Sequence, residues 1–272
     1  MDLGLHGKYA IVAGGSRGIG KAIARELARE GVDLAIVSRS REQLEQTARE
    51  LAHETGQRII PLTADVTSKE QVDGMIAQAA ERLGGLDILV NSASYPGGSA
   101  TATGPIETVV DEDLLHDFDV KYMGALRCAR AAIPFMKGQG WGRIINISGT
   151  NARTAGNLSS GARNVSLVHF TKTLAVQLGR YGITVNCIHP GVTRTERTPG
   201  LLAARAAELG ITPEEVEQRD FAPGSPRGNS IGRMVDASEI AYLTVFLASE
   251  KAWAITGELI VANGGAGQAV YY

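Results

Sequence analysis

The sequence has few of the residues that build cross-linked or metal-bound folds, with two cysteines in 272 residues. Cys128 and Cys187 form neither a CxxC pair nor a disulfide framework, which excludes a small disulfide-stapled scaffold. Both lie in apolar segments, so we expect free core thiols in a reducing compartment. We predict no metal site.

Long apolar runs and an excess of one charge are also missing. No segment has the roughly 20 apolar residues that a membrane-spanning helix needs. The formal net charge of −2 gives no general attraction for nucleic-acid phosphates or an anionic membrane. Residues 1–8 are polar and charged, unlike a signal peptide. These features favour a cytoplasmic protein whose partner is a small molecule, with no nucleic acid and no membrane.

What the chain does have is a regular alternation of short apolar runs and longer amphipathic segments. The expected strands are 9–13, 34–37, 59–62, 86–90, 143–147, 183–188 and 258–261. Long helical patterns lie between them, including one near 114–136. Continuously apolar strands with helix-length crossovers indicate a parallel sheet covered on both faces. We therefore predict a Rossmann-like, doubly wound α/β fold of about seven strands, a three-layer sandwich formed as a single domain over 1–272.

One stretch departs from the alternation. Residues 190–232 are rich in Pro, Gly, Thr and Arg, with a helical piece near 201–218. An insertion after the carboxyl end of a strand lies where ligands bind in open α/β sheets. We interpret it as a substrate lid, and a passive surface loop is the alternative.

The turn after the first strand carries the strongest motif. It reads Gly14-Gly15-Ser16-Arg17-Gly18-Ile19-Gly20 and opens a helix. Small residues let the backbone approach a pyrophosphate, and the helix start offers unpaired N–H groups and the positive end of a dipole. The position between a strand and a helix in the first βαβ unit favours a dinucleotide site over a plain tight turn.

The end of the second strand bears on which dinucleotide binds. An acid there would accept hydrogen bonds from the ribose of NAD and repel a 2′-phosphate. This chain has Ser38 and Arg39 instead. Arg39, with Arg17, offers guanidinium groups that can clamp a phosphate, although either can be an ordinary solvated side chain. We predict NADP (NADPH), with NAD less favoured.

Together with later motifs, this turn resembles the short-chain dehydrogenase/reductase family. Those motifs are Asp65-Val66, Asn91-Ser92-Ala93-Ser94, Pro190-Gly191, Ile231-Gly232-Arg233, Ile255-Thr256-Gly257 and Asn263-Gly264-Gly265. The resemblance implies that Asp65 and Val66 flank the adenine, that Asn91 and Ala93 line the cofactor path, and that 190–195 reaches the nicotinamide amide. The predicted cofactor-binding residues are Gly14, Ser16, Arg17, Gly18, Ile19, Gly20, Ser38, Arg39, Asp65, Val66, Asn91, Ala93, Asn164, Pro190, Gly191, Val192, Thr193 and Thr195.

The catalytic residues of that family are not all present. The family uses a tyrosine, a lysine four residues later, a serine and an asparagine. Matching the motifs places Ser160 and Asn164 at the tyrosine and lysine positions, and Gly149 at the serine position. Ser148 and Thr150 lie beside that glycine, and Lys121 stands at the asparagine position. The chain therefore resembles a divergent member without the Tyr/Lys pair.

A serine hydroxyl such as that of Ser160 cannot take over proton transfer near neutral pH. Asn164, at the lysine position, brings no positive charge, so the missing cation must come from elsewhere. Lys121 is the first candidate, because partial burial would lower its pKa; a salt-bridged helix residue is the alternative. Ser148, Ser160 and Asn164 complete the tentative catalytic set. Weaker candidates are Arg163, Arg153, His169, His116, His189, Tyr95 and Tyr122.

These residues lead to three hypotheses. The first is an NADP(H)-dependent oxidoreductase acting on a carbonyl or alcohol group of a small molecule. The second is a non-redox enzyme that uses the bound dinucleotide, and the third is a catalytically silent NADP-binding sensor. The resemblance also implies a homo-oligomer, a tetramer or dimer, built through the two long helices and the C-terminal strand, with the apolar residues 269–272 in the contact.

Overall fold

Seven short apolar segments pair into one parallel sheet within residues 2–267, the part of the chain that the computed structural model describes. The strand order is β3-β2-β1-β4-β5-β6-β9. The strands are β1 (Tyr9–Ala13), β2 (Asp33–Ser38), β3 (Ile59–Thr63), β4 (Ile88–Asn91), β5 (Gly142–Ile147), β6 (Ile183–Pro190) and β9 (Leu259–Ala262). The central strands β4, β5 and β6 are buried along their whole length, because helices cover both faces.

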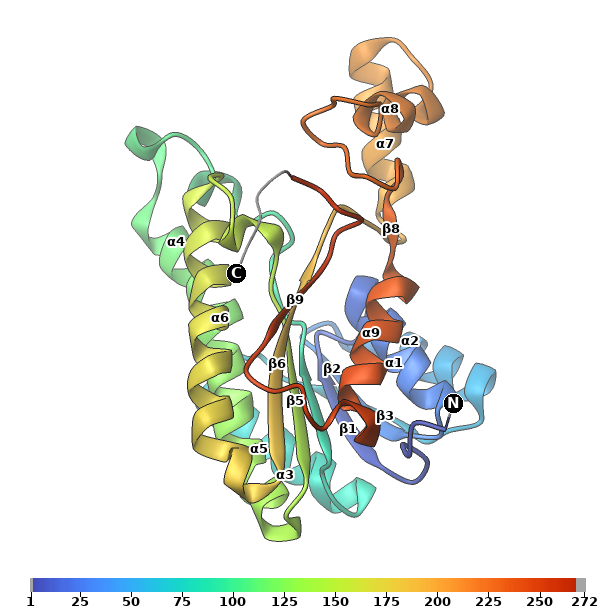
Figure 1. Cartoon of the computed structure of the whole chain (residues 1–272), viewed down its shortest axis with the longest axis vertical. Coiled ribbons are helices and arrows are strands. Elements are labelled where there is room, and N and C mark those ends of the chain that lie inside the picture. The colour runs from blue at the N-terminus through green and yellow to red at the C-terminus, as the bar shows by residue number, and fades with distance from the viewer. Residues whose placement is uncertain (1, 268–272) are drawn as a thin grey trace.

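The helices form the two outer layers of the sandwich (Figure 1). One face carries α1 (Gly18–Arg29), α2 (Arg41–Thr55) and α9 (Ala237–Ala248); the other carries α3 (Lys69–Leu83), α5 (Gly124–Gln139) and α6 (Leu158–Leu178). Each layer closes over its own apolar cluster, which includes Ile23 on the first face and Val72 on the second. The predicted Rossmann-like α/β fold is confirmed.

The helix expected near 114–136 is present as one unbroken helical run that contains a π-helical turn. The structure has α4 (Asp111–Phe118), a π-helical turn (Asp119–Met123), and then α5. One extra residue per turn shifts the side chains that follow, and such bulges often lie at functional sites. Here Val120 and Lys121 are buried within the bulge. The predicted long helix is therefore present, and only the π-helical turn inside it was not foreseen, because helical periodicity does not reveal a single inserted residue.

Residues 190–232 form a lobe beyond the carboxyl ends of the strands, on the side of α9 (Figure 1). The helical piece expected near 201–218 is two helices, α7 (Thr198–Leu209) and α8 (Pro213–Asp220). Gly210 adopts a left-handed conformation with φ 66°, and Thr212 opens α8 with a capping box, so the helix breaks there. At the lobe's base β7 (Thr193–Arg194) pairs with β8 (Val235–Asp236).

The lobe has a small apolar cluster of its own. Its buried members are Leu202, Ala206, Val216, Phe221 and Met234. This cluster is separate from the two that flank the sheet, so the lobe is packed internally. Across residues 2–267 no helix is both long and apolar enough to cross a membrane.

Candidate functional site

The strand order creates a cleft where β1 separates β2 from β4. Connections from neighbouring strands leave the sheet in opposite directions at such a switch point, and the space between them binds ligands in open α/β sheets. A cleft of about 560 Å³ lies at this edge. Its walls come from the β1–α1 turn, the segments after β4 and β5, one face of α6, and the root of the lobe.

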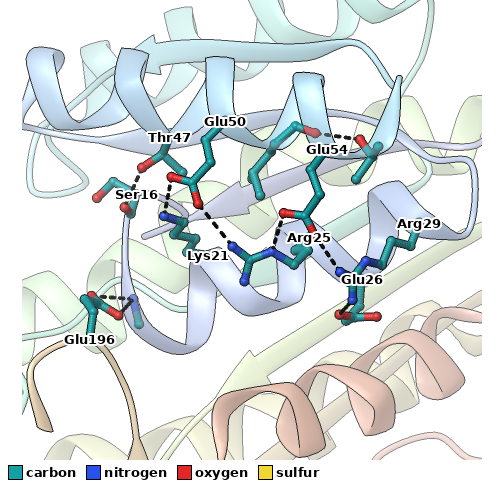
Figure 2. A network of polar contacts seen from close by, with 12 residues as sticks. Ser16, Lys21, Arg25, Glu26, Arg29, Thr47, Glu50, Glu54 and Glu196 are labelled. Atoms are coloured by element: carbon teal, nitrogen blue, oxygen red, sulfur yellow. Dashed lines mark hydrogen bonds and ion pairs between the residues drawn. The ribbon is translucent and has the colours of Figure 1, made fainter.

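The glycine turn is built for close backbone contact. Gly14 has φ 83°, and a β-carbon there would lie 2.7 Å from the backbone nitrogen of Ala93. A β-carbon on Gly20 would lie 2.1 Å from the carbonyl oxygen of Gly14. Side chains are therefore sterically excluded at both positions. The Thr47 hydroxyl of α2 donates to the carbonyl oxygen of Ser16 at 2.9 Å and holds the turn from behind (Figure 2).

Charged residues of α1 and α2 keep the helix behind this turn in place. Lys21 contacts Glu50, and Arg25 contacts both Glu50 and Glu54 (Figure 2). Isolated surface ion pairs contribute little, but a connected network orients α1 against α2. The start of α1 is thereby fixed at the cleft.

The end of β2 presents a cation rather than an acid. The Arg39 side chain is half-exposed, and its guanidinium lies 3.9 Å from the Asp65 carboxylate and 5.2 Å from the centre of the Tyr95 ring. Burial alone would raise the pKa of Asp65, but hydrogen bonds from Thr67 and the charge of Arg39 outweigh it and hold that pKa below its usual value. Arg39 is thus preoriented at the mouth of the cleft.

Lys121 lies on the cleft floor. Its side chain is buried, and Nζ donates to the carbonyl oxygen of Ser148 at 3.1 Å. Burial, and then the nearby charge of Arg163, lower the pKa of Lys121 to about 7. An amine with such a pKa can hold or release a proton near neutral pH.

Two polar side chains of α6 face the same cleft one helical turn apart. The Ser160 hydroxyl donates to Oδ1 of Asn157 at 2.6 Å and accepts from Nδ2 of Asn151 at 2.6 Å. Asn164 is buried, and its Oδ1 has no hydrogen-bond partner within the described residues. A β-carbon on Gly149 would lie 2.7 Å from Nδ2 of Asn164, so the glycine leaves room for that amide.

A second buried cation, Arg163, also lines the cleft. Its guanidinium donates to the carbonyl oxygen of Tyr95 at 2.9 Å and lies 4.0 Å from the Asp117 carboxylate. Burial lowers the pKa of Arg163, and Asp117 partly offsets that effect. Burial would raise the pKa of Asp117, but hydrogen bonds from Ser159 and Ser99 outweigh it and lower that pKa. Arg163 and Asp117 therefore form a buried ion pair beside the cleft, and the charge of Arg163 acts on Lys121.

Most of the predicted site residues meet at this cleft. Those that line it are Gly14, Ser16, Arg17, Gly18, Ile19, Gly20, Ser38, Arg39, Asp65, Val66, Ala93, Lys121, Ser148, Ser160, Asn164, Pro190, Gly191 and Thr195. Asn91, Val192 and Thr193 are not in the lining. Asn91 is buried in the sheet and donates to Oδ1 of Asn146 at 2.9 Å, while Thr193 belongs to the β7–β8 pair.

Of the weaker candidates, Arg163 and Tyr95 line the cleft, whereas Arg153, Tyr122 and the three histidines do not. His169 and Tyr122 line a separate groove between α5 and α6, and His116 bonds to the Tyr95 hydroxyl at 3.2 Å. His189 is fully buried, and burial lowers its pKa to about 4. Sequence reasoning gave no spacing argument for Tyr95, although Tyr95 lines the cleft.

The sequence analysis also missed several lining residues, and four of them are polar or charged side chains that bear on the site. They are Gln43, Asn151, Glu196 and Arg197. The last two directly follow the predicted segment 190–195, so extending that segment by two residues would have found them. Within residues 2–267, no three His, Cys, Asp or Glu side chains are grouped to hold a metal ion.

The sheet order and its cleft define a Rossmann-like α/β protein. A family model described as enoyl-(acyl carrier protein) reductase matches residues 13–267. The chain belongs to the short-chain dehydrogenase/reductase family.

Individual relatives match along nearly their whole length. The NADPH-dependent reductase BacG of Bacillus subtilis is 33% identical over 261 residues, which cover 95% of this chain and 97% of BacG. The 3-oxoacyl-(acyl-carrier-protein) reductase FabG of Aquifex aeolicus is 31% identical over 268 residues, covering 97% and 99%. The structure of L-sorbose reductase from Gluconobacter frateurii, complexed with NADPH and L-sorbose, superposes with a TM-score of 0.92 at 31% identity, covering 99% and 100%.

Proposed function

We propose that this protein is an NADPH-dependent oxidoreductase that interconverts a carbonyl and an alcohol group of a small molecule through a non-standard catalytic site. The observation that carries the proposal is the buried Lys121 ammonium on the floor of the cleft, with a pKa lowered to about 7. Membership of an oxidoreductase family, and relatives named as reductases, support the reaction class.

The residues of the cleft fit NADPH. Gly14 and Gly20 leave a backbone cradle that any β-carbon would fill, which suits a pyrophosphate. Arg39 and Arg17 supply guanidinium groups for a 2′-phosphate. The end of β2 has Ser38 and Arg39 in place of the acid that would accept hydrogen bonds from the ribose hydroxyls of NAD. BacG is named as NADPH-dependent, and the sorbose reductase structure contains NADPH.

In the proposed mechanism the protein donates the proton to the substrate oxygen. NADPH, when bound, supplies the hydride that reduces the carbonyl carbon. The Lys121 ammonium stabilises the developing charge on the substrate oxygen and then gives that oxygen a proton from Nζ. The neutral amine regains its proton from solvent. Oxidation of an alcohol runs the same steps in reverse, with the neutral amine as base.

Two residues of α6 orient the substrate oxygen in this proposal. The Ser160 hydroxyl is held by Asn151 and Asn157, so it presents a positioned hydrogen-bonding group. The Asn164 amide offers both a donor and an acceptor where the family resemblance places a lysine. The substitution removes a cation from α6, and Lys121 supplies one from the π-helical turn.

The lobe 190–232 is proposed as a lid on the single domain 1–272. It is rooted in Pro190, Gly191 and Thr195, all in the cleft lining. Movement about this root would shield the reacting groups from water, which strengthens electrostatic interactions inside the site.

The test is NADPH oxidation, followed by absorbance, with a panel of ketones, quinones and imines. We expect turnover whose rate falls above pH 7, because deprotonation of Lys121 removes the acid. Lys121→Met should lower the rate by about 100-fold or more and remove that pH limb. Lys69→Met, at a half-exposed position, is the control. Coenzyme binding without turnover would instead favour the silent sensor or a non-redox enzyme.

We also propose a homo-oligomer that uses the α5–α6 face. A groove there is lined by Tyr122, Leu126, Ile133, Phe170 and Leu174, among others. On α6, Val176 is 77% exposed and Val165 is 50% exposed, which adds apolar surface to this helix. Residues 269–272, assigned to the same contact from the sequence, lie outside the described residues. Val176→Asp should shift the mass measured by light scattering toward a monomer. The cytoplasmic location stays a prediction.

A further inference from the structure

A carboxylate of the protein itself is bound to the helix start expected to hold the coenzyme's pyrophosphate. The backbone N–H of Gly18, the first residue of α1, donates to both carboxylate oxygens of Glu196, at 2.9 and 3.1 Å (Figure 2). Arg17, the residue before the helix, provides no side-chain cap. Glu196 thus neutralises the positive end of α1 from 178 residues along the chain.

Glu196 is fixed to the base of the lobe. The Thr195 N–H donates to the Thr198 hydroxyl at 2.9 Å, and the Thr198 N–H donates back to the Thr195 carbonyl at 3.0 Å. Arg194 contacts Glu217 of α8 and lies 3.5 Å from Asp236. The backbone that bears Glu196 is therefore fastened to α7, α8 and β8, so movement of that base would carry the carboxylate away from Gly18.

The carboxylate and a pyrophosphate cannot share this amide. A single N–H directs one donor at one anion, and like charges a few ångströms apart in a cleft repel strongly. Arg17 and Arg197 also line the cleft, and their guanidinium groups can bind either a carboxylate or a phosphate. A dinucleotide entering this cleft must therefore displace Glu196.

We propose that Glu196 is an internal competitor of the coenzyme's pyrophosphate, which weakens coenzyme affinity and links coenzyme binding to movement of the lobe's base. This rests on the coenzyme-binding part of the proposed function and not on turnover. When Glu196 leaves, the pyrophosphate takes the Gly18 amide, and residues 195–198 carry the start of α7 with them.

The test compares two ligands that differ in the pyrophosphate. NADPH contains it, whereas adenosine 2′-monophosphate has only the adenosine 2′-phosphate end. Dissociation constants are measured by calorimetry for the wild type, Glu196→Ala and Glu196→Gln. We expect Glu196→Ala to bind NADPH about tenfold more tightly, since it removes a charged hydrogen-bond partner, with adenosine 2′-monophosphate unchanged. Glu196→Gln should give a smaller gain, because its neutral amide still accepts from Gly18.

Glu208→Ala is the matched control, because Glu208 is an exposed acid on the same lobe, in α7. Amide exchange gives a second readout. NADPH should speed amide exchange at 191–198 in the wild type, because it releases Glu196 from Gly18. Glu196→Ala should show the same faster exchange without coenzyme. Unchanged or weaker NADPH binding by both Glu196 variants overturns the proposal, as does an equal gain for both ligands. Failure of the wild type to turn over any substrate would count against the proposed reaction alone; failure to bind either ligand would overturn both.

Discussion

Gly149 and Asn164 are a matched pair, because the side-chain amide of Asn164 lies 2.7 Å from the place that a β-carbon on Gly149 would take. The family resemblance places a serine at 149 and a lysine at 164. The close approach means that the residue at 149 and the position of the Asn164 amide constrain each other. A serine at 149 would require the Asn164 amide to move.

This pair predicts a measurable coupling. Gly149→Ala should lower the free energy of unfolding by about 1–2 kcal/mol, because the new β-carbon overpacks against the buried amide. The backbone itself adds no strain, since it is extended there (φ −176°) and tolerates alanine. In an Asn164→Ala background the same change should cost much less, giving a coupling of about 0.5–3 kcal/mol in urea melts. Gly138→Ala, where a new β-carbon meets nothing within 4 Å, is the control. Additive effects would mean that the amide moves aside freely.

Lys121 should make stability depend on pH. Its pKa falls to about 7 in the folded state from the ordinary lysine value of 10.5, so between these values the unfolded chain binds more protons. Stability therefore rises with pH across pH 7–10.5, and the cost of the buried charge is greatest below pH 7.

The variant Lys121→Met should remove this contribution. We expect it to be more stable than the wild type by about 1–3 kcal/mol at pH 6, since each pKa unit corresponds to about 1.4 kcal/mol and the lost bond to Ser148 offsets part of the gain. The difference should shrink toward pH 10 in thermal melts. A difference that stays constant with pH would show that Lys121 titrates normally.

Arg39 should discriminate between the two coenzymes. Arg39→Ala should weaken NADPH binding by about 10- to 100-fold through loss of charged hydrogen bonds, and leave NADH binding nearly unchanged. Titrations followed by nicotinamide fluorescence measure both constants. Arg41→Ala, a highly exposed arginine two residues away, is the control. An equal loss for both coenzymes would assign Arg39 to packing against Tyr95 instead.

The glycine turn offers a steric test. Gly20→Ala places a β-carbon 2.1 Å from the Gly14 carbonyl oxygen, and the backbone must shift to accept it. We expect a loss of at least about 2 kcal/mol in unfolding free energy, together with loss of NADPH binding. Gly74→Ala in α3 meets nothing within 4 Å and should stabilise the protein by about 0.5–1 kcal/mol. Retained NADPH binding by Gly20→Ala would argue against a pyrophosphate at this turn.

The sequence by itself determined the fold class, because apolar strands and amphipathic helices leave periodic patterns that depend on neighbours in the chain. The glycine turn was equally readable, since its backbone contacts are set by residues 14–20. Two local features were hidden by periodicity, the π-helical turn before Gly124 and the left-handed Gly210 that divides the helical piece near 201–218.

Only the tertiary structure decided what the polar residues near the cleft do. Lys121 is buried where the Ser148 carbonyl accepts from its Nζ and Arg163 lies near enough to lower its pKa, and no spacing in the chain encodes that desolvation. Glu196 meets Gly18 across 178 residues, and Gly149 meets Asn164 only because α6 packs beside the end of β5. Such contacts are set by the packing of distant segments, and the chemistry of the cleft depends on them.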